Sequence, residues 1–214
     1  MAKPFQFYTE QGVVFYAGYK ADNLKSLLNG LRGVPSSSIF YHVYHSLLRR
    51  HYTTTDYMND FAQWVWGVLW HKTLGEKLAS FDPLEFTRVR DARAGLIEIV
   101  QDYVGENEYF LRVPEEQAFY FLCIKSFIYP VGIQAATLPE LMQALRVVSP
   151  QSLFYHLIES RLRLREPSND ISNWIKSELV MPELARTIHS FSPYEYNLEE
   201  LRNKLITAIQ NAVK

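Results

Sequence analysis

The sequence has only one cysteine, Cys123, among its 214 residues. A disulfide within the chain is therefore impossible, and a metal site built from several thiolates of one chain is excluded. Cys123 lies in the apolar segment FYFLCIKSFIY, where we expect it to be buried as a small hydrophobic side chain. The fold must depend on its core rather than on cross-links.

Long apolar runs and an excess of one charge are also lacking. The opening residues, MAKPFQFYTEQG, hold no run of signal-peptide length, and no segment approaches the roughly 18 uninterrupted apolar residues of a membrane-spanning helix. Basic and acidic residues number 22 and 23, which leaves a net charge of −1. Such a balance gives no broad attraction to nucleic acid or to an anionic membrane. We therefore expect a soluble, cytoplasmic protein that binds neither.

The composition is otherwise that of a globular protein. Hydrophobic residues make up 48% of the chain and charged residues 21%, which excludes a disordered chain. Aromatic residues are plentiful at 14%, and they favour large buried contacts.

An internal repeat is the strongest feature of the sequence. Pro35–Arg50 matches Ser149–Leu164 at a separation of 114 positions. The match runs without a gap from Phe5/Phe119 to His51/Arg165, and 16 of its 47 pairs are identical, where about three would be expected by chance. Beyond a short deletion the separation is 110, and the pairs include Asn59/Asn169, Asp60/Asp170, Trp64/Trp174, Leu74/Leu184, Phe81/Phe191 and Pro83/Pro193. We infer two repeats, 1–104 and 115–214, joined by a linker at 105–114 and packed as one globular unit.

Each half predicts the same order of elements. Phe5–Tyr8 and Val13–Tyr16 flank Glu10–Gly12, which is the pattern of a short β-hairpin. Leucines at helical spacing follow, and an asparagine, Asn59 or Asn169, is expected to cap a later helix that carries tryptophan. The expected fold is α+β and mostly helical: two tandem copies of a short β-hairpin followed by about four helices, packed with pseudo-twofold symmetry.

Five motifs lie among these elements: Phe-x-Phe, Leu-x-x-Leu-x-x-x-Leu, Ser38–His42, Asn59–Trp64 and Leu74–Leu78. Together they resemble an uncharacterised bacterial and archaeal family known as a domain of unknown function. The resemblance covers most of each half and is better in the first, since Ile171–Ser172 replaces Phe61–Ala62 in the second. It implies an architecture and brings no activity, cofactor or partner.

A polar seam lies on the repeated helix. Its members in the first half are Ser38, His42, Ser46 and Arg49, which recur as Ser152, His156, Ser160 and Arg163. At this spacing the four side chains share one face of a helix. We expect a buried polar network that ties this helix to the start of the tryptophan helix, because polar groups that are buried must be hydrogen-bonded. The alternative is catalysis with His42 as a base and Asp60 as its orienting acid.

Metal binding is a second alternative for this helix. His42 and His45 are three residues apart and could share an ion such as zinc. They are weak candidates, because no HExxH motif surrounds them and Glu159 replaces His45 in the second half. We expect no metal and no cofactor.

Two tryptophans distinguish the halves. Trp66 and Trp70 lie one helical turn apart, and the second half has Lys176 and Val180 at these positions. The common architecture does not require them, so we expect the second half or another chain to cover them.

The function expected from these features is a non-catalytic interaction or scaffold module, with a protein partner or a second copy bound through Trp66 and Trp70. The residues assigned to binding are Trp66, Trp70, Tyr41 and His45. The alternative is a small-molecule-binding protein or an enzyme, with its site in the first half around His42, His45, Asp60 and Tyr41.

Overall fold

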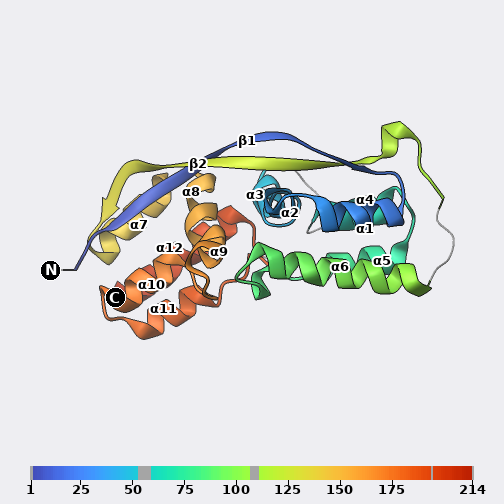
Figure 1. Ribbon diagram of the computed structural model, residues 1–214. Coiled ribbons are helices and arrows are strands. Elements are labelled where there is room, and N and C mark those ends of the chain that lie inside the picture. The colour runs from blue at the N-terminus through green and yellow to red at the C-terminus, as the bar shows by residue number, and fades with distance from the viewer. Residues whose placement is uncertain (1, 53–58, 107–110, 194, 214) are drawn as a thin grey trace. The chain divides into compact units, whose positions relative to one another are not determined.

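The computed structural model describes residues 2–52, 59–106, 111–193 and 195–213 (Figure 1). The chain forms two compact units. Unit 1 consists of Met1–Gln11 and Ser126–Lys214, and unit 2 consists of Gly12–Lys125. Both boundaries fall inside β-strands, whereas the linker predicted at 105–114 falls inside unit 2, and its residues 107–110 lie outside the described part.

Each half contributes one long strand, β1 (Phe5–Ala21) or β2 (Phe119–Ala135). The two strands pair with each other, so the predicted hairpin within each half is wrong. Glu10–Gly12 lacks the Asn-Gly or Asp-Gly pair that favours a two-residue turn. Pairing along 17 residues also satisfies more backbone groups than two four-residue arms could. The α+β, mostly helical class is confirmed.

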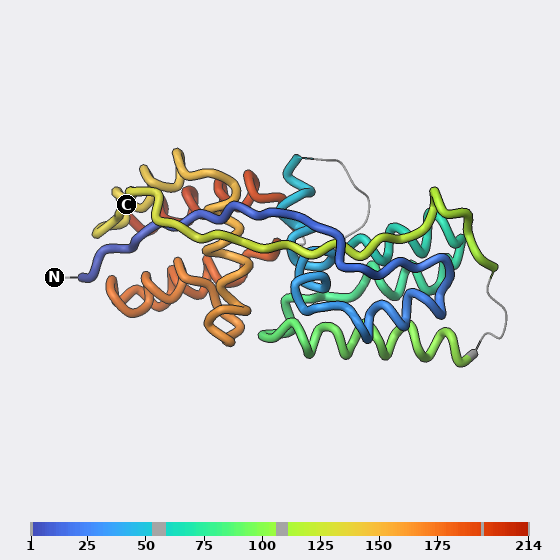
Figure 2. The backbone as a smooth tube through the Cα atoms, turned by 45° about the horizontal axis from the view of Figure 1, so that its top comes forward, coloured from blue at the N-terminus to red at the C-terminus, as the bar shows by residue number. Residues whose placement is uncertain are grey.

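The strands run antiparallel, side by side in both units (Figure 2). In unit 1 the side chain of Gln134 donates to that of Gln6 over 2.7 Å. In unit 2 the rings of Tyr16 and Tyr120 lie 5.9 Å apart. Each unit therefore combines the start of one repeat's strand with the helices of the other repeat.

In unit 2, α6 contacts α1, α2 and α5, and α4 packs against α5 (Figure 1). The elements are α1 (Leu24–Gly33), α2 (Ser36–Val43), α3 (His45–Arg49), α4 (Asp60–Gly67), α5 (Lys72–Ala79), η1 (Pro83–Glu85), α6 (Val89–Glu106) and η2 (Glu115–Gln117). The core between them includes the fully buried side chains of Leu24, Leu27, Ile39, Phe61, Leu74 and Leu96.

In unit 1, α12 contacts α7, α8 and α11, and α10 packs against α11. The elements are α7 (Leu138–Val147), α8 (Pro150–Phe154), the π-helical turn η3 (Tyr155–Glu159), α9 (Ser160–Leu164), α10 (Asp170–Ser177), α11 (Pro182–His189) and α12 (Leu198–Val213). Among the described residues, no helix combines the length and apolarity needed to cross a membrane.

Side-chain caps define the starts of the tryptophan helices, as predicted. Asn59 accepts a hydrogen bond from the backbone of Ala62 over 2.9 Å, and Asn169 accepts one from Ser172 over 2.8 Å. Both asparagines have extended backbone and are buried, so each satisfies an amide of the first turn that would otherwise lack a partner. The caps fix where α4 and α10 begin, and thereby place Asp60 and Asp170 at the first helical position.

Replacing these caps should destabilise the protein unequally. Asn169→Ala should cost about 1 kcal/mol, the usual value for a lost cap. Asn59→Ala should cost about 2 kcal/mol, because Asn59 also donates to the buried carbonyl of Leu78. Urea unfolding of both variants, beside the exposed control Gln63→Ala, measures the difference. Free energies equal to that of the control would contradict the capping role.

Candidate functional site

A buried histidine lies at the centre of unit 2. His42, on α2, is 3% exposed. Its Nδ1 lies 2.6 Å from Oδ2 of Asp60, and its Nε2 lies 2.9 Å from the backbone nitrogen of Leu122 on β2. Since the Leu122 N–H must donate, Nε2 is the unprotonated nitrogen and Nδ1–H donates to the carboxylate. His42 therefore joins a strand, its own helix and the start of α4.

The charges around His42 support this arrangement. Burial lowers the pKa of His42, in opposition to the effect of Asp60, so the ring is neutral at pH 7. Burial would raise the pKa of Asp60, but the hydrogen bond with His42 and the charge of Arg49 outweigh it and lower that pKa. Arg49 donates to Asp60 over 2.6 Å and to the hydroxyl of Tyr41 over 3.2 Å. Its guanidinium also lies 4.4 Å from the centre of the Tyr41 ring.

Unit 1 has the same network. His156 contacts Asp170 through Nδ1 over 2.7 Å and accepts from the backbone of Tyr8 on β1 through Nε2 over 2.9 Å. Arg163 donates to Asp170 and lies 4.7 Å from the centre of the Tyr155 ring. The histidine, aspartate and arginine of the expected network are thus joined in both units, and the structure adds the strand as a further partner. The serines behave differently: Ser152 donates to the carbonyl of Tyr8, whereas the hydroxyl of Ser38 is buried without a partner among the described residues.

The tryptophans shared by the two repeats bind the chain just before the strands that the histidines hold. The indole of Trp64 donates to the carbonyl of Gln117 over 2.7 Å, and that of Trp174 donates to the carbonyl of Lys3 over 2.7 Å. Both side chains are otherwise buried. Each therefore fixes the chain immediately before a strand.

This geometry occupies both nitrogens of His42. A substrate proton or a metal ion would have to displace either Asp60 or the Leu122 amide, whose loss leaves a buried group without a partner. Within the described ranges, no group of three or more His, Cys, Asp or Glu side chains could hold a metal ion. His42 and Asp60 lie together, as expected, and their contacts serve the packing of the strand.

Two of the four residues predicted to bind a partner, Tyr41 and His45, lie at this network. The rings of Tyr41 and His45 stack with centres 5.6 Å apart. Burial, with a smaller effect of Arg49, lowers the pKa of His45 to about 4, so this ring is neutral at pH 7. Tyr41 is 7% exposed and His45 is partly buried, which leaves little of either for a ligand.

Unit 1 has an acid at the position of His45. Glu159 shares a hydrogen bond with Glu10, which is 3% exposed. Burial and the charge of Glu10 raise the pKa of Glu159 to about 8. The pKa of Glu10 is also raised by burial, while its hydrogen bonds to Glu159 and Ser126 act against the rise. Two buried carboxyl groups therefore share a proton at pH 7.

The two tryptophans specific to the first half differ in exposure. Trp66 is half-buried against α5, where a Cβ atom added to Gly75 would lie 2.9 Å from the Cβ of Trp66. Trp70 is 74% exposed and has a left-handed backbone with φ of 60°. α5 thus covers part of Trp66, and the cover expected for Trp70 remains a prediction.

A set of surface residues that the sequence did not single out lies on the strands. Val13, Phe15 and Tyr16 of unit 2 are 57%, 49% and 50% exposed. In unit 1, Ile128 and Tyr129 are 45% and 46% exposed. Val13–Tyr16 was predicted only as one arm of a hairpin, and nothing in the sequence pattern indicated that these side chains would be exposed.

Comparison with known proteins identifies relatives of the whole chain. Residues 2–210 match a family described as "Family of unknown function (DUF5752)". The structure of OrfY from Thermoproteus tenax is similar with a TM-score of 0.81 and 27% sequence identity, over 98% of this chain and 95% of OrfY. No curated protein matches the chain.

Removal of either central histidine should loosen the strand that it holds. His42→Ala leaves the Leu122 amide and Asp60 without their partner, and should cost about 3–5 kcal/mol, as other broken buried pairs do. Hydrogen exchange of the Leu122 amide should accelerate in this variant, and that of the Tyr8 amide in His156→Ala. Unchanged exchange at these two amides would contradict the anchoring role, whatever the loss in stability.

The contribution of Glu159 to the stability of the protein should fall as the pH rises from about 5 to about 8, whereas His45, whose pKa burial lowers, acts in the opposite direction below about 6.5. Glu159 has a pKa of about 8 in the folded chain, against about 4.3 when unfolded. Over this range the folded state keeps a proton that the unfolded state has released, so a higher pH favours unfolding. Between pH 5 and pH 8, the free energy of unfolding of Glu159→Gln should therefore fall by a few kcal/mol less than that of the parent. Urea unfolding at each pH measures both values.

Glu98→Gln is the matched control, because Glu98 is exposed on α6. It should keep the slope of the parent. If Glu159→Gln also keeps that slope, the shared proton is disproved.

Proposed function

Because the chain belongs to the DUF5752 family, whose function is unknown, we propose a function from its own geometry: a non-catalytic module in which each unit binds protein through its exposed strand residues, on β1 in unit 2 and on β2 in unit 1. The observation that carries this proposal is the run of uncharged, exposed side chains on both strands. The segments 12–19 and 126–135 contain no Lys, Arg, Asp or Glu. Val13 and Phe15 on β1, and Ile128 and Tyr129 on β2, are each 45–57% exposed.

Exposed strands of this kind are unusual in a soluble chain that acts alone. Natural proteins protect exposed strands with charged side chains, bulges or prolines, since unpaired backbone groups invite pairing with another chain. The segment 12–19 of β1 has no charged residue and no proline, and the segment 126–135 of β2 has only Pro130. The described sheet has two strands, so each strand has one edge without a neighbouring strand. Aromatic residues such as Phe15 and Tyr129 are also enriched in protein interfaces, where charged residues are depleted.

The partner we propose is a second copy of this chain. A second copy brings the same uncharged strand, and antiparallel pairing about a twofold axis is closed and self-complementary. Trp70, at 74% exposure, is a further apolar contact in unit 2. The pseudo-twofold arrangement of two duplicated halves is part of this proposal and is supported by the matching networks of His42 and His156.

The competing function, an enzyme centred on His42 and Asp60, has less support. Both nitrogens of His42 have protein partners, and Asp60 already binds Arg49. A general base needs a lone pair within reach of its substrate, and this arrangement offers none.

Charges placed on the strands should abolish self-association. Phe15→Lys and Tyr129→Lys change equivalent exposed positions, so the double variant should keep the melting temperature of the parent within a few degrees. Sedimentation equilibrium should give a dimer for the parent and a chain of 25.0 kDa for the variant. Val213→Lys is the control, since Val213 is 51% exposed on α12, and it should remain dimeric. A parent that stays monomeric at its highest soluble concentration would overturn the proposed partner.

A further inference from the structure

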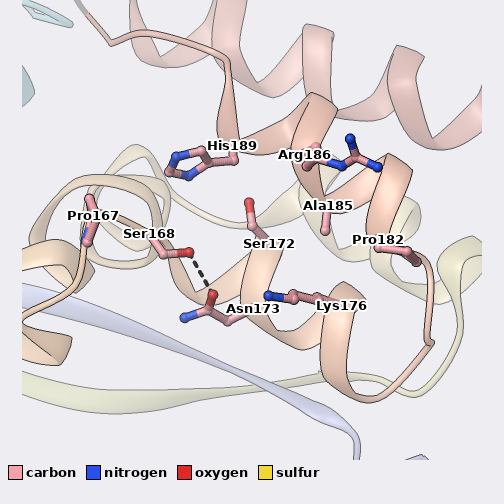
Figure 3. A pocket seen from close by; sticks show the side chains of 9 residues that line it. All are labelled: Pro167, Ser168, Ser172, Asn173, Lys176, Pro182, Ala185, Arg186 and His189. Carbon is pink, nitrogen blue, oxygen red and sulfur yellow. Dashed lines mark hydrogen bonds between the residues drawn. The ribbon is translucent and has the colours of Figure 1, made fainter.

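Unit 1 has a pocket of about 290 Å³ between α10, α11 and the segment before α10 (Figure 3). It is lined by Pro167, Ser168, Ser172, Asn173, Lys176, Pro182, Ala185, Arg186 and His189. The volume is near the lower end of the range for small-molecule sites, which begins at about 300 Å³. All of its lining residues lie on helices or in the segment before α10, and none lies on a strand.

The lining is basic and contains no acid. Lys176 of α10 and Arg186 and His189 of α11 contribute to it, and Arg186 also pairs with Glu183. Arg161, on α9, is near enough to His189 to lower its pKa, in addition to the larger effect of burial. The positive charge of the lining comes from Lys176 and Arg186, and it is local, because the whole chain has a net charge of −1. It favours an anionic ligand.

Two polar atoms of the pocket need a partner. The hydroxyl oxygen of Ser172 and Nδ1 of His189 are buried, and neither has a hydrogen-bond partner among the described residues. Ser172 as a whole is only 4% exposed, and its side chain is directed from α10 toward the space below His189 (Figure 3). A buried polar group without a partner costs about 1–3 kcal/mol. A ligand that accepts hydrogen bonds from both would remove that cost.

The hydroxyl of Ser168 and the side chain of Asn173 complete the polar wall. They are joined by a hydrogen bond of 2.6 Å, in which the hydroxyl donates to the amide oxygen (Figure 3). The amide nitrogen of Asn173 is a further donor for the pocket. Cation, hydroxyl, amide and imidazole groups thus come from two helices and one loop.

The other repeat lacks this chemistry. At the corresponding positions Trp66 replaces Lys176, Glu76 replaces Arg186, Ala79 replaces His189 and Ala62 replaces Ser172. The shared architecture is kept in both units by the histidine and tryptophan contacts described above. The basic lining is therefore not required for the fold and is specific to unit 1.

We propose that this pocket is a binding site for a phosphate group, either as inorganic phosphate or on a small phosphorylated metabolite. Lys176 supplies the charge, and Ser172, Asn173 and His189 donate hydrogen bonds. A phosphate group presents three or more strong acceptor oxygens, which suits several donors converging from different elements better than the two oxygens of a carboxylate.

The test is isothermal titration of the parent with inorganic phosphate, glycerol phosphate and citrate, with sodium chloride at matched ionic strength as the blank. Binding of phosphate or glycerol phosphate is expected, and the tighter of the two identifies the source. Lys176→Gln should weaken binding by about ten-fold, the effect of one charge-assisted hydrogen bond. Lys77→Gln is the control, since it removes the same charge from an exposed site on α5 and should leave binding unchanged.

Ser172→Ala separates binding from folding. Alanine occurs at the corresponding Ala62, so this variant should fold. Without phosphate its melting temperature should equal or exceed that of the parent, because a buried hydroxyl without a partner is removed. With phosphate the parent should gain stability and the variant should not. No binding to the parent, equal binding to Lys176→Gln and Ser172→Ala, or tighter binding of citrate would each overturn the proposal.

Discussion

The structure depends on one kind of hydrogen bond, from a strand amide to a buried neutral histidine. His42 accepts from Leu122, and His156 accepts from Tyr8, each over 2.9 Å. The second nitrogen of each ring binds the aspartate at the start of the next helix. A charged histidine could not accept this bond, so burial, which keeps His42 neutral, is part of the mechanism. In each unit the histidine thereby joins three elements: the strand, its own helix and the helix that carries the tryptophan.

These hydrogen bonds explain why the strand of each repeat packs on the helices of the other repeat. A strand as long as β1 extends past its own helices, and its first residues reach the histidine of the second repeat. Phe5 and Phe7 then pack on His156, while Phe119 and Phe121 pack on His42. Each unit therefore depends on both repeats, because the histidine of one repeat accepts its hydrogen bond from the strand of the other.

The differences between the units lie around this shared frame. The position of His45 becomes Glu159, which shares a proton with Glu10. At the position of Trp66 the second repeat has Lys176. Trp66 packs beside Gly75 in unit 2, whereas Lys176 lines the basic pocket of unit 1. Since the frame is satisfied in both units, such positions are free to change, and they are where recognition by each unit can differ.

The sequence by itself determined the local structure of this protein. Leucine spacing identified α1 and α7, and Asn59 and Asn169 identified the starts of α4 and α10, because periodicity and capping act over a few residues. The repeated histidine, His42, was predicted to form a buried network with Asp60, because the capped helix that begins at Asp60 follows the histidine helix closely in the sequence.

Only the tertiary structure decided which strand each histidine holds. Tyr8 and His156 are separated by 148 positions, and Leu122 and His42 by 80, so no local pattern links them. The apparent hairpin around Glu10–Gly12 failed for this reason: backbone hydrogen bonds with a distant strand outweighed a weak local turn. The pocket of Ser172 and His189 also required the packing of α10 on α11, because it joins side chains whose positions a single helix does not define.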